Sequence, residues 1–410
     1  MTRWEFRQIP SVGEMGTSVG IGQSVNRDSH AAGRDAATAA VASLAGTPPS
    51  LVLVFATAGH DQQALLDGIR AVTGDAPLSG CSAEGVISRD GSDESSHAVG
   101  VMAFASDRLR FQTVSARGLG PQSQKSGGDF AGHLERGDGG ELLLVFPDGL
   151  TLHSAGLFAG IEAGLRRPLA MVGGAAGEMM QFQRTFQYHD GAVLSDAVAG
   201  VLIGGDFETE IEVSHGCDVV GNERTVTRAE GSVVYEIDGR PAWSVIQEYL
   251  EEGSDDLDGL AVSYACVAER MPNASGDYGQ YVIRTPLGLD KATGALTFPG
   301  ELRSGATIFM ARRDPMRIRD NAIRSAARIA ERRRGQSPLA VLQFDCTGRG
   351  RLLFGERTTA DLIAPMQEAL DPNAPWLGFH TYGEIAPVAG RTHYHNYTVV
   401  LCAIYARPER

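Results

Sequence analysis

The chain has 410 residues, a formal net charge of −14 at pH 7 and 43% hydrophobic residues. This length exceeds one ordinary hydrophobic core and predicts two or more domains. The acidic balance argues against nucleic acid as a partner, because phosphate backbones are bound by clustered Lys and Arg. No stretch approaches the roughly 20 apolar residues that cross a bilayer, so membrane insertion is not expected.

The five cysteines are scattered along the chain without C-x-x-C or zinc-like spacing. An odd number of unpaired cysteines predicts free thiols in a reducing compartment. Residues 1–30 contain no apolar core of the kind found in signal peptides. We therefore expect a cytoplasmic protein.

Apolar runs and helical patterns alternate along the chain. Trp4 and Phe6 open a short predicted strand. Further strands are predicted at 51–55, 207–216 and 233–238, with short strands within 281–309. Helices are predicted at 30–44, 61–72, 154–165, 241–250 and 314–334, and an acidic linker at 251–258. The basic cluster 317–334 is interpreted as a solvated helix face rather than an interaction patch.

One pattern appears three times, at 50–104, 141–203 and 338–401. Each copy is predicted to contain a buried strand, a helix, a short strand ending in a glycine turn, and another apolar strand. Gly80 precedes His97 by 17 residues and Gly378 precedes His395 by 17, whereas Gly173 precedes Asp196 by 23. This agreement predicts one supersecondary unit reused around a common centre.

These patterns predict a mixed α/β (α+β) fold of two related halves, with a ligand cleft near the glycine turns. Residues 1–30 are expected to form an N-terminal extension. The first two copies belong to a domain at 31–225 and the third to a domain at 226–410.

Three carboxylates fall in or just after the glycine turns: Glu84, Glu178 and Glu384. Loops of this kind at strand ends are common ligand sites in α/β sheets. Each Glu could therefore accept hydrogen bonds from a ligand amine or hydroxyl. The alternative is a carboxylate that caps its own turn by accepting from backbone amides.

The segment 344–351 follows a predicted buried strand and contains Cys346 and Arg349. The fork of donors on Arg349 suits a carboxylate or phosphate, but no P-loop is present. Cys346 could act as a nucleophile beside His380 or His395, which requires contact with that base. The simpler interpretation is a buried, inert thiol.

Tyr382 and three histidines, His380, His393 and His395, lie close together in sequence. A neutral imidazole could bind a haem iron or another metal. No H-E-x-x-H or Cys/His pair is present, so a histidine satisfied by protein hydrogen bonds is the alternative.

Ordered motifs over residues 30–400 resemble the FIST family of sensory and signalling proteins. The motifs are GCSAEG at 80–85, GGAAGE at 173–178, CTGR at 346–349, GFHTYGEI at 378–385 and HNYT at 395–398. The resemblance implies that 31–225 is a FIST N-like domain and 226–410 a FIST C-like domain. Together, these candidates and motifs predict a ligand site that includes Cys81, Ser82, Glu84, Glu178, Cys346, Arg349, His380, Tyr382, Glu384, His395 and Asn396.

The residues and the resemblance together lead to three hypotheses for function, of which the resemblance implies the first two. The first is a sensor of a small, amino-acid-like ligand that acts through a separate protein, such as a histidine kinase or a cyclic-dinucleotide enzyme, because the chain has no kinase or cyclase motif. The second is a haem sensor of nitric oxide, with His395 as the preferred ligand. The third is an enzyme with Cys346 or Cys81 as nucleophile or Glu384 as general base.

Overall fold

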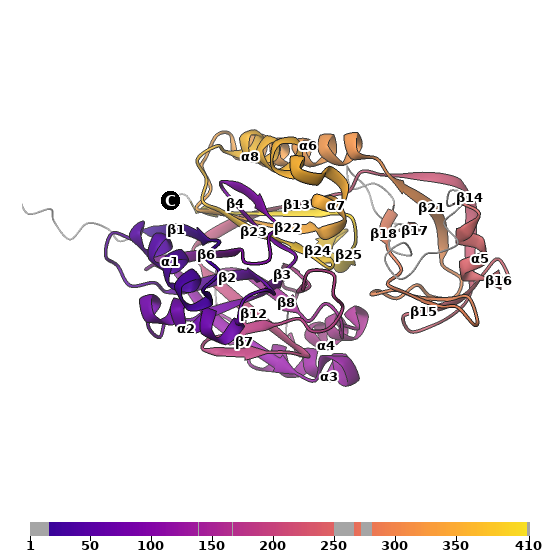
Figure 1. Cartoon of the computed structure of the whole chain (residues 1–410), viewed down its shortest axis with the longest axis horizontal. Coiled ribbons are helices and arrows are strands. Elements are labelled where there is room, and N and C mark those ends of the chain that lie inside the picture. The colour runs from indigo at the N-terminus through magenta and orange to yellow at the C-terminus, as the bar shows by residue number, and fades with distance from the viewer. Residues whose placement is uncertain (1–15, 138, 166, 250–265, 272–280, 408–410) are drawn as a thin grey trace, which may run out of the picture.

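The computed structural model describes residues 16–137, 139–165, 167–249, 266–271 and 281–407. The strand predicted at Trp4 and Phe6 and the linker predicted at 251–258 lie outside the described residues. The described chain is mixed α+β, which confirms the predicted class (Figure 1). None of the described helices is long and apolar enough to cross a membrane.

Three six-stranded sheets share one arrangement: two antiparallel strands, a parallel pair, and a hairpin at the edge. The first sheet has the order β1 (Thr17–Ser24), β6 (Val99–Ser106), β2 (Leu51–Thr57), β3 (Leu78–Ala83), β10 (Gln187–His189), β11 (Ala192–Leu194). The second has the order β7 (Leu109–Arg117), β12 (Ala197–Gly205), β8 (Gly140–Pro147), β9 (Met171–Gly174), β24 (Glu384–Val388), β25 (Arg391–His395). The third has the order β13 (Phe207–Ser214), β26 (Val399–Ala406), β22 (Ala340–Cys346), β23 (Trp376–Thr381), β4 (Gly85–Ser88), β5 (Gly91–Asp93). The larger part of the described chain is therefore built from three similar sheets, whereas the sequence predicts two related halves.

Each edge hairpin joins a different sheet from the strands that precede it in the chain. The hairpin β4–β5 follows β3 of the first sheet but pairs with β23 of the third. The hairpin β10–β11 follows β9 of the second sheet but pairs with β3 of the first. The hairpin β24–β25 follows β23 of the third sheet but pairs with β9 of the second. The three sheets are thus linked in a closed cycle.

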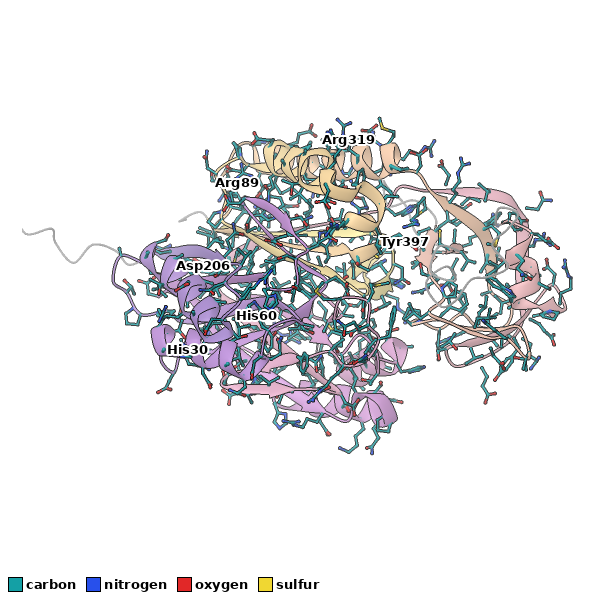
Figure 2. The ribbon with its side chains drawn as sticks, in the orientation of Figure 1. His30, His60, Arg89, Asp206, Arg319 and Tyr397 are labelled. Atoms are coloured by element: carbon teal, nitrogen blue, oxygen red, sulfur yellow. The ribbon has the colours of Figure 1, made fainter. Side chains whose placement is uncertain are left out.

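The inner faces of the three sheets meet in one apolar core, and side chains fill the space between them (Figure 2). At equivalent positions of β2, β8 and β22 stand Phe55, Phe146 and Phe344. The ring centroid of Phe55 lies 5.3 Å from that of Phe146 and 6.5 Å from that of Phe344, and the other pair is 6.2 Å apart. This aromatic cluster joins all three sheets, because each ring comes from a different one.

A pair of helices covers the outer face of each sheet (Figure 1). The pairs are α1 (Ser29–Ala42) with α2 (Gln62–Thr73), α3 (Leu119–Gly132) with α4 (Ser154–Gly164), and α6 (Pro315–Arg333) with α8 (Ala364–Leu370). Between β22 and α8 the chain forms short helical segments at Thr347–Arg349, α7 (Arg351–Phe354), Gly355–Arg357 and a π-helical turn at Thr359–Ile363. Alternate residues of the central strands face the core and the helices, as a two-residue period requires.

A fourth sheet lies to one side of this body, at the right of Figure 1. Its strands are β18 (Tyr281–Arg284), β17 (Cys266–Arg270), β21 (Thr307–Arg313), β14 (Cys217–Glu230), β15 (Val233–Ile237), β20 (Ala295–Thr297) and β19 (Gly288–Asp290), with β16 (Arg240–Pro241) beside β15. Its one described helix is α5 (Ala242–Gln247). Val226, where the sequence places a domain boundary, lies inside β14.

The basic cluster on α6 contacts strand β13 rather than lying free on the surface. The half-exposed face of β13 presents three glutamates to the helix. The ion pairs are Arg328–Glu212, Arg332–Glu210, Arg332–Glu212, Arg333–Glu208 and Arg333–Glu210, with nitrogen–oxygen distances of 2.6–3.0 Å. A linked set of this kind fixes the helix on the sheet better than isolated surface pairs do.

The glycines predicted to form turns lie inside strands, so this part of the prediction is wrong. Gly80, Gly173 and Gly378 are in β3, β9 and β23. An added Cβ would lie only 1.8 Å, 1.9 Å and 2.0 Å from the carbonyl oxygens of Val54, Val145 and Gln343 on the neighbouring parallel strands. Glycine is required because the backbones approach so closely, not because the chain turns.

We predict that Gly378→Ala lowers the free energy of unfolding by about 3 kcal/mol, because a backbone carbonyl cannot move aside as a side chain can. Urea unfolding followed by circular dichroism measures this change. Gly132→Ala is the matched control, since nothing lies within 4 Å of its added Cβ. Equal stabilities of the two variants would contradict the close-approach argument.

Candidate ligand-binding site

The connections that follow β3, β9 and β23 meet at one place in the structure. Glu84 Oε1 accepts hydrogen bonds from the backbone nitrogens of Glu178 (2.9 Å) and Met180 (3.0 Å). The Tyr382 hydroxyl donates to Glu178 Oε1 at 2.8 Å. Burial raises the pKa of Glu84, and it also raises the pKa of Tyr382. The carboxylates of Glu84 and Glu178 therefore connect the three segments to one another. This favours the interpretation that they accept hydrogen bonds from within the protein over direct ligand binding.

One of the three connections is much longer than the others. Only Glu84 separates β3 from β4, and only Tyr382 and Gly383 separate β23 from β24, whereas residues 175–186 separate β9 from β10. The extra length of this connection is more than enough to account for the six extra residues in the second copy of the sequence pattern. It forms a loop that the other two copies lack.

The backbone of this loop is held in an unusual conformation. Met179, Met180 and Phe182 have φ angles of 67°, 55° and 53°, in the left-handed region that side chains disfavour. The Glu178 carboxylate accepts from the backbone nitrogens of Phe182 and Gln183. Such strained residues persist only where the surroundings fix them, and they concentrate at functional sites.

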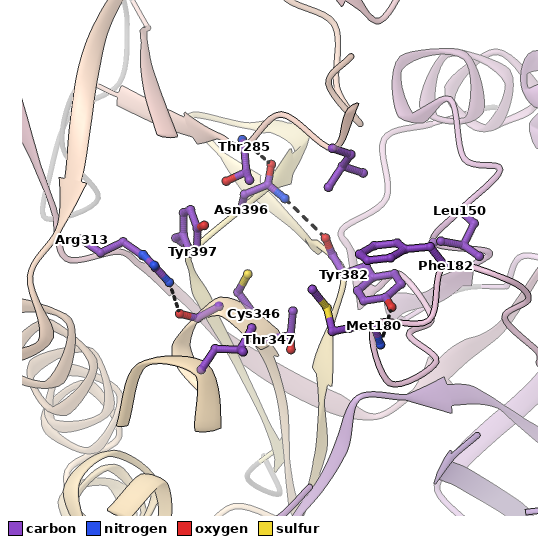
Figure 3. A pocket seen from close by; sticks show the side chains of 14 residues that line it. Leu150, Met180, Phe182, Thr285, Arg313, Cys346, Thr347, Tyr382, Asn396 and Tyr397 are labelled. Carbon is purple, nitrogen blue, oxygen red and sulfur yellow. Dashed lines mark hydrogen bonds between the residues drawn. The ribbon is translucent and has the colours of Figure 1, made fainter. Parts of the chain in front are cut away.

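The loop forms one wall of a cavity of about 60 Å³ (Figure 3). Met180 and Phe182 of the loop form this wall together with Leu150, which follows β8. The other walls come from the fourth sheet with its connections and from the third copy of the sequence pattern, at 338–401. The segment between β18 and β19 supplies Thr285 and Leu287, β21 supplies Arg313, and the third copy supplies Cys346, Thr347, Gly348, Leu352, Tyr382, Asn396 and Tyr397. The cavity therefore lies where three parts of the chain meet.

The rim of the cavity is apolar and exposed. The side chains of Phe182, Leu287 and Leu352 are 48%, 40% and 41% exposed, among the most exposed large apolar residues of the described chain. The Phe182 ring stacks on Tyr382, with centroids 5.7 Å apart and planes 14° apart. Exposed apolar groups gathered at a hollow are typical of a binding site.

Polar groups lie at the opposite side of the cavity from Leu150 and Phe182 (Figure 3). Asn396 Oδ1 accepts from the Thr285 backbone nitrogen at 3.2 Å, and Asn396 Nδ2 donates to the Tyr382 carbonyl at 3.4 Å. Arg313 donates to the Gly348 carbonyl at 2.9 Å and lies over the Tyr397 ring. The cavity thus has an apolar end and a polar end.

Of the predicted site residues, Cys346, Tyr382 and Asn396 line this cavity, and Glu84 and Glu178 hold its loop. Ser82 also supports the loop, because its hydroxyl donates to the Gly177 carbonyl at 2.7 Å and accepts from the Phe186 nitrogen. The structure places the other five away from the cavity lining: Cys81, Arg349, His380, Glu384 and His395.

These five residues have internal partners or lie in the core. Cys81 belongs to the central apolar core. The Nε atom of buried Arg349 lies 2.8 Å from Asp345 Oδ1. The charge of Arg349 is therefore paired with a carboxylate inside the protein rather than with an external anion. His380 Nε2 lies 2.8 Å from the Ser92 hydroxyl. Glu384 accepts from Thr381 and Thr398.

The thiols do not suit nucleophilic catalysis. Burial raises the pKa of Cys346 and of Cys81 well above the ordinary value, so both stay protonated at neutral pH. His380 and His395, the expected bases, contact Ser92 and the Ala386 carbonyl.

His395 does not fit a haem ligand. It is fully buried, and its Nε2 atom lies 3.2 Å from the Ala386 carbonyl oxygen. Burial lowers its pKa to about 3, which gives a neutral imidazole, yet His395 does not line the cavity. Within the described ranges, no group of three or more His, Cys, Asp or Glu is placed to hold a metal ion.

Sequence reasoning missed the apolar part of the lining: Leu150, Met180, Phe182, Leu287 and Leu352. Apolar residues in loops have no motif that separates them from core residues. One signal was present, because the second copy has a spacing of 23 where the others have 17, and the longer loop that carries Met180 and Phe182 accounts for this difference.

Comparison with known proteins agrees with the sequence motifs. The model of the FIST N domain matches residues 50–240, and that of the FIST C domain matches 242–387. The chain therefore belongs to the FIST family, which confirms the resemblance. FIST domains are generally sensory domains of signal transduction that bind small ligands.

Relatives of similar length carry the name of uncharacterised proteins. A protein of Mycobacterium tuberculosis is 30% identical over 386 residues, which cover 93% of this chain and 97% of that protein. A protein of Mycobacterium bovis is also 30% identical, over 387 residues and the same shares of each chain. Among solved structures, the cyanuric acid hydrolase from A. caulinodans is similar with a TM-score of 0.38 and 8% identity, covering 96% of this chain and all of that one.

We predict that Glu384 makes stability fall as pH rises. Burial raises the pKa of this carboxyl from 4.5 to about 8, against the opposing hydrogen bonds from Thr381 and Thr398. The folded state therefore keeps a proton that the unfolded state has lost between these two values. Stability should fall by about 1.4 kcal/mol per pH unit across this window from Glu384 alone.

Urea unfolding at several pH values between 5 and 8 measures this slope. Glu384→Gln should flatten it, because the amide mimics the protonated acid and the Thr381 hydroxyl can accept from its nitrogen. The difference between the two proteins isolates Glu384 from other titrating groups. Parallel slopes would show that the carboxyl is ionised in the folded state.

Proposed function

We propose that this protein is a sensor that binds a small, largely apolar molecule in the cavity between the 175–186 loop, the fourth sheet and the third repeat. The single observation that carries the proposal is the apolar rim of Phe182, Leu287 and Leu352 around a hollow lined by three parts of the chain. Family membership supports it, because FIST domains generally bind small ligands in signalling.

The chemistry of the lining favours binding without catalysis. The described lining residues include no Asp, Glu or His. Cys346 is present, but burial raises its pKa well above the ordinary value. General acid–base chemistry needs a group that exchanges protons near the working pH. A ligand held here would meet no such base.

The position of the cavity suits a sensor, because one ligand would contact the loop, the fourth sheet and the third repeat together. Its binding energy would favour one arrangement of these parts over others. A separate signalling protein, such as a histidine kinase or a cyclic-dinucleotide enzyme, would detect that arrangement. All five cysteines are buried and free of disulfides, which supports action in the reducing cytoplasm.

A thermal-shift screen of small metabolites tests the proposal, since any ligand of the native state raises its stability. Leu352→Trp should abolish the shift, because the larger ring fills the cavity from its exposed rim. Met316→Trp is the matched control, since Met316 is 61% exposed and lies outside the cavity. A ligand saturating at 100 times its Kd should stabilise the wild type by about 2.7 kcal/mol.

The same experiment can refute the proposal. Ligands that stabilise Leu352→Trp as much as the wild type bind elsewhere. If no small molecule stabilises the wild type, the cavity is only a packing feature and the proposed sensor function is refuted.

A further inference from the structure

The cavity is too small for most small-molecule ligands in the conformation of this structure. Its volume is about 60 Å³. An apolar cavity of roughly 150 Å³ holds a single benzene molecule, and pockets for larger ligands measure about 300–1,000 Å³. A ligand of more than a few atoms therefore enters only if one wall moves. The walls differ in how firmly they are attached to the rest of the protein.

The 175–186 loop is closed at its base by one residue. The Ser82 hydroxyl donates to the Gly177 carbonyl at 2.7 Å and accepts from the Phe186 backbone nitrogen at 2.9 Å. The Ser82 backbone bonds the same two residues, donating to Phe186 (2.8 Å) and accepting from Gly177 (3.1 Å). The two ends of the segment 178–184 are thus held close together, as in an Ω-loop. Because its ends are fixed at one point, the segment between them can move as a unit.

The segment 178–184 is also bonded within itself. The Glu178 carboxylate accepts from the backbone nitrogens of Phe182 and Gln183. Residues 181–184 are exposed. Three residues of the segment keep the left-handed φ angles described above, a conformation that is unfavourable for side chains. The segment is therefore a compact, strained unit whose strain persists only while contacts with the body fix it.

Two residues of the body hold this segment over the cavity. Among the described residues, the hydrogen bonds from 178–184 to other segments go to Glu84 and Tyr382. The Met180 nitrogen lies 3.0 Å from Glu84 Oε1 and 3.1 Å from the Tyr382 hydroxyl. The exposed Phe182 ring stacks on the Tyr382 ring (Figure 3). The other lining residues lie in, or within three residues of, a strand or helix, so the segment 178–184 is the wall with the weakest attachment.

We infer that residues 178–184 form a lid on the cavity, which is closed in this structure and swings away from Tyr382 to admit a ligand. This inference rests on the proposed function, because it concerns access to the same cavity. Tyr382 keeps the lid closed, since its hydroxyl bonds Met180 and its ring stacks on Phe182. Opening relieves the left-handed strain, which offsets part of the lost contacts. The lid thereby sets how fast a ligand enters and leaves.

Hydrogen exchange of the ligand-free full chain, followed by mass spectrometry, measures how often the lid opens. Tyr382→Phe removes the hydroxyl and keeps the ring, so exchange in 178–183 should become roughly tenfold faster. Phe182→Ala removes the stacked ring and should speed exchange there by about twofold to tenfold. Tyr394→Phe is the matched control, because the Tyr394 hydroxyl is buried and makes no hydrogen bond with any described residue. It should leave exchange in the lid unchanged.

Alkylation of Cys346 by iodoacetamide tests whether the opened lid admits a small molecule. Cys346 lines the cavity and is only 5% exposed, so the reagent must enter the cavity to reach it. Labelling of Cys346 should speed up in parallel with exchange of the lid in the same variants. Cys81 and Cys402 lie in the central core and become labelled only on global unfolding. Cys266 of the fourth sheet becomes labelled if that sheet moves instead.

Three results would overturn the inference. One is unchanged exchange of 178–183 in both Tyr382→Phe and Phe182→Ala. Another is faster exchange of the lid without faster labelling of Cys346. The third is labelling of Cys346 together with Cys266 while the lid stays protected, which would make the fourth sheet the moving wall.

The remaining outcomes are separable from these. If Tyr382→Phe labels Cys81 as fast as Cys346, that variant unfolds globally, and Phe182→Ala decides, because its ring is exposed and lies outside the core. A lid that opens although no metabolite binds would refute the proposed function alone. A lid that stays closed while a metabolite binds would refute the lid alone.

Discussion

The contact among Phe55, Phe146 and Phe344 is the constraint on which the rest of this structure depends. Each ring stands near the end of a central strand in a different sheet, and the three centroids lie within 6.5 Å of one another. Because these strands run parallel to β3, β9 and β23, the segments that follow those strands must also converge. The site is thus a consequence of core packing.

The three converging connections are not equivalent, because the longest of them lines the cavity with the apolar rim. The difference is local. Two of the connections are one and two residues long and contribute Glu84 and Tyr382, while the 175–186 loop reaches across to Tyr382. The fourth sheet then closes the remaining side with Thr285 and Leu287. The proposed site lies where one copy of the pattern departs from the other two, as strained and irregular positions often mark function.

The elements of the body could be predicted from sequence because their patterns are strong. The apolar run at 51–55 is the core of β2, and the helix predicted at 154–165 is α4 within one residue. The sequence predicts turns at Gly80, Gly173 and Gly378, because it shows that glycine is present but not which neighbour requires it. Here the reason is a carbonyl on a strand about 26 to 35 residues away, which only the parallel pairing reveals.

The site was only partly predictable for a related reason. Tyr382 and Asn396 stand in motifs, but the exposure of Phe182 and Leu287 depends on neighbours remote in sequence. Arg349 illustrates the opposite error, since its donors suit an anion, and the anion is the buried Asp345 four residues earlier. Polar residues near glycine-rich segments show where a junction lies, whereas the direction of each side chain depends on long-range packing.

The cyclic exchange of hairpins has a consequence for how the protein is made. On the ribosome, β9 emerges more than 200 residues before β24, the strand that covers its edge. During that interval the second sheet presents unpaired backbone groups, the kind of edge that joins other chains. The third sheet, in turn, receives β4 and β5 from residues made long before it. Nascent chains of this protein therefore hold an open sheet edge until residues 384–388 have been made, which makes β24 a requirement for safe folding of the second sheet.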